Sequence, residues 1–118
     1  MMINTFPALL QSFFTARLLQ QLRASPHTIA SYRDTFRLFL RFANEELGKE
    51  PSALSLIDLT PEFLSSFLEY VEKGRNNCVR TRNVRLAAIH SFFRSVSFRD
   101  PEYADRCYQL LASPSNRV

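Results

Sequence analysis

A run of cationic side chains without a nearby carboxylate is the part of this sequence most suited to chemistry with an anion. Residues 78–96 read C-V-R-T-R-N-V-R-L-A-A-I-H-S-F-F-R-S-V, with four arginines, one histidine and no acidic residue. The planar guanidinium of arginine pairs bidentately with phosphate or with the edge of guanine. A surface that keeps only cations is typical of a protein that binds a polyanion, most often nucleic acid.

The charge distribution along the whole chain supports this interpretation. The 118 residues carry a net charge of +4, and thirteen arginines stand against two lysines. Seven of the eleven acidic residues fall within 45–72, and none falls within 73–99. The second range holds seven cations: Lys73, Arg75, Arg80, Arg82, Arg85, Arg94 and Arg99. Cationic surface is therefore expected to be segregated from acidic surface.

Helices are the elements expected to position these side chains. Three pairs, Ser25-Pro26, Thr60-Pro61 and Asp100-Pro101, place a capping oxygen before a proline at the first helical position. These starts predict helices over 26–46, 61–73 and 101–112. Hydrophobic spacing predicts two more, over 7–22 and 80–97.

The expected fold class is all-α, a single compact bundle of four to five helices. Two glycines leave little room for the tight turns of an all-β fold. A connector is expected from Gly48 to Leu59, with Gly48 as the helix stop. One domain is expected over residues 1–112, and 113–118 read as the start of a linker.

The helix expected over 80–97 has two distinct faces. Its core stripe consists of apolar residues at helical spacing: Leu86, Ile89, Phe92, Phe93 and Val96. The opposite face has polar side chains around small central residues, with a histidine at its margin: Arg80, Asn83, Ala87, Ser91, Arg94 and His90. Arginine and asparagine recognise guanine and adenine edges in the major groove. The alternative is a solvated cationic face, with Arg94 placed favourably near a helix C-terminus.

The helix expected over 26–46 carries a second cationic row. Arg33, Arg37 and Arg41 follow one another at i, i+4 and i+8. Like charges at this spacing destabilise a helix by a few tenths of a kcal/mol per pair, which indicates an anionic partner. Short donors suited to phosphate stand at the helix start: Ser25, His27 and Thr28.

The apolar residues of the same helix define its packing. The expected core stripe is Ile29, Tyr32, Phe36, Leu40, Ala43 and Leu47. Leu38 and Phe42 lie on the far side, where the first helix would cover them. Otherwise they would mark a partner surface.

No motif of a catalytic or metal site occurs. The sequence lacks a P-loop, G-x-G-x-x-G, G-x-S-x-G and H-E-x-x-H. His27 and His90 are far apart in sequence and lack a cysteine or carboxylate constellation. We therefore expect no catalytic residue, metal or cofactor.

A cytoplasmic location without a membrane segment is expected. Gln11 and Arg17 interrupt the first apolar run, and no stretch approaches the ~20 apolar residues of a membrane span. Cys78 and Cys107 are read as free thiols, with a disulfide between them as the open alternative.

Three segments resemble the tyrosine recombinases and phage integrases. A-S-P-H-T-I-A-S-Y-R-D-T-F-R-L-F-L-R-F-A, residues 24–43, is similar to their S-x-x-T-x-x-x-Y-x-x-x-L-x-x-F-x-x-F helix. D-L-T-P-E-F-L-S-S-F-L-E-Y, residues 58–70, is similar to their L-T-x-x-x-I-x-x-F-L segment, and T-R-N-V-R-L-A-A-I-H-S-F-F-R, residues 81–94, to T-x-N-x-R-L-x-A-I-R-x-F-F. The closing P-S-N-R resembles the connector to a catalytic domain. The order and spacing of the three segments agree with the family's.

The resemblance implies a core-binding, SAM-like domain that clamps one face of duplex DNA. Strand cleavage and rejoining would belong to a separate C-terminal domain of a tyrosine recombinase. Residues 90–94 have one residue too many for the family's His-x-x-Arg motif. The chain, a fragment or a truncated recombinase, is expected to take part in DNA integration and recombination by binding double-stranded DNA without cleaving it. It would act beside other recombinase protomers on DNA and be a monomer in isolation.

The resemblance also places the helices over 26–46 and 80–97 against DNA. The expected phosphate contacts are Arg33, Arg37, Arg41, Arg80 and Arg82. Asn83, Ala87, Ser91 and Arg94 would face the groove. The family often has arginine where His90 stands, and base-specific roles do not transfer between members with different targets.

A helical protein-interaction module of death-domain or SAM-like type is the second hypothesis. Such a module would bind acidic partners, with Leu38 and Phe42 as candidate anchors. Duplex DNA would not compete with those partners. A complete catalytic recombinase would require the chain to continue beyond Val118.

Overall fold

The computed structural model describes residues 5–74 and 79–112, without the side chains of Val79 and Arg80. Within these ranges the chain forms five α-helices and no strand, which confirms the all-α class. Two compact units are present, Met1–Asp58 and Leu59–Val118, and each is described by itself. The expectation of one domain over 1–112 stays a prediction, and the expected linker at 113–118 lies outside the described residues.

The first unit begins with a helix whose winding changes partway. Helix α1 spans Phe6–Ser12 and continues into a π-helix, η1, over Phe13–Gln21. The expectation of one α-helix over 7–22 was therefore wrong in its second half. The wider winding brings two consecutive rings, Phe13 and Phe14, to Phe36, with ring centroids 6.3 and 6.1 Å away in edge-on geometry.

Helix α2, Pro26–Leu47, starts and stops as its sequence predicts. The Ser25 hydroxyl accepts a hydrogen bond from the Thr28 amide at 3.1 Å. Gly48 ends the helix in the left-handed region at φ 66°, and its amide donates to the Asn44 carbonyl. The local chemistry of these two ends is thus sufficient to set the helix length.

The buried face of α2 differs from the expected stripe. Phe36 and Ala43 are buried as expected, but Leu47 is exposed. The remaining buried positions are Thr35, Leu38, Phe39 and Phe42. Leu38 and Phe42 are only 5% and 4% exposed, so neither presents an anchor to a partner. Phe39 stacks on Phe6 of α1 at 5.6 Å, so α1 packs on this broader face.

The connector after α2 contains two short 3₁₀ turns, η2 (Pro51–Ala53) and η3 (Leu56–Asp58). Lys49 Nζ lies 2.7 Å from Asp58 Oδ1, and the Ser55 amide donates to the other carboxylate oxygen at 3.0 Å. Phe6 N donates to the Leu54 carbonyl at 3.2 Å, which ties the start of α1 to this connector.

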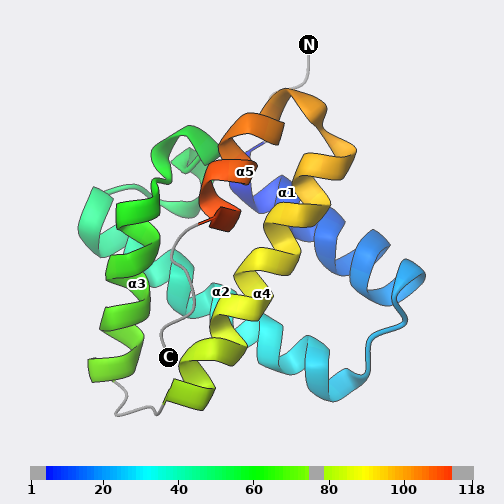
Figure 1. Cartoon of the computed structure of the whole chain (residues 1–118), viewed down its shortest axis with the longest axis horizontal. Coiled ribbons are helices and arrows are strands. Elements are labelled where there is room, and N and C mark those ends of the chain that lie inside the picture. The colour runs from blue at the N-terminus through cyan, green and yellow to red at the C-terminus, as the bar shows by residue number, and fades with distance from the viewer. Residues whose placement is uncertain (1–4, 75–78, 113–118) are drawn as a thin grey trace. The chain divides into compact units, whose positions relative to one another are not determined.

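The second unit consists of α3 (Pro61–Gly74), α4 (Val79–Arg99), a 3₁₀ turn η4 (Pro101–Tyr103) and α5 (Ala104–Ala112). Helix α4 contacts both α3 and α5 (Figure 1). The Thr60 hydroxyl caps α3 by accepting from the Phe63 amide at 3.0 Å, as expected. Arg106 of α5 donates to the Leu59 carbonyl at 3.1 Å and so holds α5 to the start of α3.

The last helix begins later than expected. Asp100 precedes η4, and its side chain makes no capping hydrogen bond, so the expected Asp100 cap was wrong. The helix expected from residue 101 starts at Ala104. Cys107 is a buried free thiol, and burial, with a smaller contribution from Asp100, raises its pKa to about 11. Cys78 lies outside the described residues. No helix in the described ranges is long and apolar enough to cross a membrane.

Candidate nucleic-acid interface

Helix α4 presents one apolar face to its unit and one exposed polar face. The predicted core residues are all buried: Leu86, Ile89, Phe92, Phe93 and Val96. Asn83, Ala87 and Arg94 are exposed, and Ser91 and His90 are half-buried. The sequence correctly divided the helix because its apolar residues recur at helical spacing. Arg80 belongs to the same helix, but its side chain lies outside the described residues.

The exposed face of α4 is hollowed at its centre. A depression of about 190 Å³ is lined by Asn83, Leu86, Ala87, His90 and Arg94. It lies where the small side chain of Ala87 stands between longer polar ones. Arg94 forms no ion pair with any described residue. Amide, imidazole and guanidinium groups therefore surround a hollow that no acidic side chain of the described part occupies.

The environment of His90, at the edge of this hollow, favours the neutral form of its imidazole. Burial lowers its pKa, and the neighbouring Arg94 charge lowers it further. Its Nε2 is buried without a hydrogen-bond partner among the described residues. A neutral imidazole can donate or accept one hydrogen bond at a base edge, and proximity of phosphate would favour its protonated form.

Arg82, one of the phosphate contacts expected from the sequence, is buried. Its side chain is 6% exposed, and its Nε lies 3.6 Å from Oε1 of Glu72 on α3. Its neighbour on the same face, Arg85, is also buried. Burying a guanidinium requires compensating partners, and a carboxylate from α3 supplies one for Arg82. Arg82 is therefore left out of the interface proposed below.

The cationic row of α2 lies in the first unit. Arg33, Arg37 and Arg41 are all exposed, as expected from their spacing. None of the three forms an ion pair with a described residue. Three like charges on one flank, without internal carboxylate partners, leave this surface able to bind an anion.

At the start of α2, the Ser25 hydroxyl is engaged in hydrogen bonds that cap the helix. The Ser25 hydroxyl donates to the Thr28 hydroxyl at 3.1 Å while accepting from the Thr28 amide. His27 is exposed beside them, and Thr28 is half-buried. These residues therefore lie at one helix end, as expected, with the Ser25 hydroxyl already engaged.

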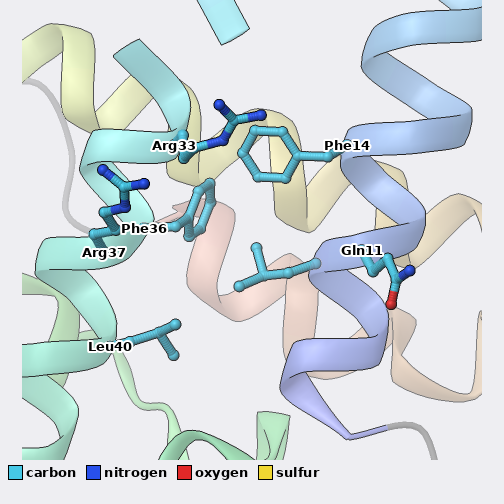
Figure 2. A pocket seen from close by; sticks show the side chains of 7 residues that line it. Gln11, Phe14, Arg33, Phe36, Arg37 and Leu40 are labelled. Carbon is cyan, nitrogen blue, oxygen red and sulfur yellow. The ribbon is translucent and has the colours of Figure 1, made fainter. Parts of the chain in front are cut away.

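A pocket beside the arginine row was not foreseen from the sequence. Leu10, Gln11 and Phe14 of the first helical stretch line it together with Arg33, Phe36, Arg37 and Leu40 of α2 (Figure 2). The π-helical winding from Phe13 contributes Phe14, and simple α-helical periodicity does not indicate that change in winding. The only signal in the sequence is the pair of consecutive phenylalanines.

The described residues form an all-α fold with cationic helix faces. The family model described as "Phage integrase, N-terminal SAM-like domain" matches residues 11–97. The chain therefore belongs to the family of phage integrase N-terminal SAM-like domains. This confirms the resemblance found in the three sequence segments.

Two curated relatives come from Sinorhizobium fredii. "Putative integrase/recombinase y4rC" is 50% identical over 109 residues, and "Putative integrase/recombinase y4rD" is 44% identical over 110 residues. The matches cover 92% and 93% of this chain, but only 33% and 39% of the respective relatives. The chain thus spans between a third and two fifths of these relatives' length. No solved structure matches it.

Proposed function

We propose that this chain binds duplex DNA as the core-binding part of a site-specific recombinase or integrase. The observation that carries the proposal is the exposed face of α4, where Asn83, His90 and Arg94 surround a hollow over Ala87. The helix has no acidic residue along its length. Long polar side chains around a small residue suit a helix that approaches the base edges of a groove.

The arginine row of α2 would supply phosphate contacts. Arg33, Arg37 and Arg41 are exposed and lack ion-pair partners among the described residues. Phosphate contacts fix orientation on the duplex, while contacts from α4 would carry sequence preference. Ser91 extends the proposed α4 surface, the contact expected from Arg80 stays a prediction from the sequence, and Ser25, His27 and Thr28 offer donors at the start of α2.

Membership of the integrase family supports this proposal, and catalysis is not assigned to the chain. The matched family model is the N-terminal SAM-like domain, and the named relatives extend well beyond the matched part. We propose that the parent protein is a tyrosine recombinase whose strand cleavage occurs in a separate domain. The chain would then act in the cytoplasm beside other recombinase protomers on DNA, and would be a monomer without it.

A titration with a fluorescent duplex of about 25 base pairs, followed by anisotropy, tests the proposal. Each phosphate contact should add about −0.9 to the slope of log affinity against log salt concentration. We expect binding at low salt and a slope of several units. Absence of binding at low salt, or a slope near zero, would contradict the proposal.

A further inference from the structure

The pocket beside the arginine row has an apolar lining, which phosphate binding would not require. It lies within the first unit, between the stretch of α1 and η1 on one side and α2 on the other, and has a volume of about 250 Å³. Phe14 and Phe36 meet edge-on, with ring centroids 6.1 Å apart, and line the pocket together with Leu40 from the same helix as Phe36 (Figure 2). The apolar part of its lining therefore consists of aromatic and aliphatic side chains.

The size and polarity of the pocket suit a large apolar side chain. A cavity of about 150 Å³ accommodates benzene, so this pocket has room for an aromatic ring or a branched aliphatic group. Gln11 and the two arginines are the polar residues among those lining it. A nucleobase buried here would leave most of its donors and acceptors without partners, which is unfavourable. An apolar side chain carries no such cost.

The two arginines that line the pocket, Arg33 and Arg37, form its rim and favour an occupant with negative charge. Arg33 and Arg37 stand one helical turn apart on α2, are exposed, and form no ion pair with a described residue. Their Cβ atoms are therefore expected to be roughly 5–6 Å apart. Two carboxylates flanking an apolar anchor would complement this pair, with guanidinium–carboxylate hydrogen bonds that fix orientation.

We propose that this pocket binds an acidic protein segment, which packs one large apolar side chain against Phe14, Phe36 and Leu40 and pairs its carboxylates with Arg33 and Arg37. An amphipathic helix laid into a groove is the recognition mode that combines such an anchor with flanking charges. The surface goes beyond DNA binding, and it gives two of the α2 arginines a protein partner. The adjacent Arg41 does not line the pocket and provides a matched control.

The experiment selects binders from a display library of random 12-residue peptides on the purified chain. Selected peptides are then titrated against wild type and three variants. Gln11→Trp fills the pocket from an exposed position without changing charge. Arg33→Ala combined with Arg37→Ala removes the two positive charges at the rim. Arg41→Ala removes one positive charge from the same helix outside the pocket. Circular dichroism checks that all variants retain their helices.

The expected result is enrichment of peptides that carry an aromatic or large aliphatic residue flanked by Asp or Glu. Their affinity should fall by about tenfold or more in Gln11→Trp and in the double arginine variant, because anchor pockets carry most of the binding energy. Arg41→Ala should leave their affinity nearly unchanged.

Two results would overturn the proposal. Either no acidic, anchor-bearing peptides are enriched, or those enriched bind Arg41→Ala as poorly as the double variant and are insensitive to Gln11→Trp. The same variants separate this surface from DNA binding. If the arginine row serves DNA alone, Arg41→Ala and the double arginine variant both weaken duplex binding, and no selected peptide depends on the pocket.

Discussion

The Nε of Arg82 lies 3.6 Å from Oε1 of Glu72, and this contact joins α4 to α3 within the second unit. The arginine side chain is 6% exposed, whereas the glutamate is 31% exposed. A buried guanidinium depends on its partner far more than an exposed one does. An arginine that the sequence placed with the DNA contacts therefore has a structural role in this unit.

Substitution of Glu72 should consequently destabilise the fold. Glu72→Gln leaves the buried Arg82 charge without its carboxylate, and the expected loss is roughly 1–3 kcal/mol in the free energy of unfolding. Urea unfolding followed by circular dichroism measures it. Glu69→Gln is the matched control on α3, because Glu69 is exposed and its Oε1 lies 3.9 Å from Nζ of the exposed Lys73. Equal midpoints for wild type and Glu72→Gln would contradict the assigned role of the pair.

Substitutions of Arg82 and Arg94, two of the arginines of α4, should change different properties of the protein. Arg94→Ala should weaken duplex binding and reduce the salt slope by up to about one unit, because an exposed cation is removed from the face proposed to meet the groove. Arg82→Ala should lower the unfolding midpoint, with little change in the salt slope of the folded protein. Anisotropy titrations and urea unfolding on both variants make the comparison. A larger loss of salt slope in Arg82→Ala than in Arg94→Ala would reverse the assignment.

The connector salt bridge predicts a dependence of stability on pH. Burial raises the pKa of Asp58, but hydrogen bonds from Lys49 and Ser55 outweigh it and leave that pKa below its ordinary value. A carboxyl group with a lowered folded pKa contributes stability above its unfolded pKa, and this contribution is lost as the pH falls through the folded pKa.

Asp58→Asn isolates this contribution. Unfolding midpoints measured from neutral to strongly acidic pH should fall more steeply in wild type than in the variant. The difference should arise at and below the ordinary titration range of aspartate. Parallel curves for the two proteins would show that Asp58 is not stabilised as a carboxylate by Lys49 and Ser55.

His90 should titrate below its ordinary pKa of 6.5 in the folded chain. Burial is the larger cause and Arg94 the smaller, so Arg94→Ala should raise the pKa only part of the way back. Because the folded pKa is depressed, stability should decrease as the pH falls from the unfolded pKa toward the folded one. An NMR titration of the imidazole measures the pKa directly, and a value at or above 6.5 would contradict the described environment.

Most features set by local chemistry could be predicted from the sequence, although the cap expected at Asp100 does not form. The caps at Ser25 and Thr60 and the stop at Gly48 depend on residues within one helical turn, and all three occur as expected. The apolar stripe of α4 follows from its periodicity in the same way.

Features that depend on distant residues could not be predicted. Nothing local to Arg82 shows that Glu72 faces it from another helix. The burial of Leu38 and Phe42 shows that α2 buries a broader face than one apolar stripe indicates. The π-helical winding after Ser12 likewise places Phe14 at a pocket for which the sequence has no motif.

The exposed face of α4 is the central element of the proposed function, and a charge inserted at its centre tests it most directly. Ala87→Glu puts a carboxylate into the hollow, whereas Phe98→Glu introduces the same charge on the same helix at a site that is 88% exposed and outside the hollow. Duplex titration by anisotropy at low salt compares both variants with wild type. The proposed interface predicts that Ala87→Glu loses at least about tenfold in affinity, while Phe98→Glu loses clearly less. Equal affinities for wild type and a folded Ala87→Glu would contradict DNA binding by this face.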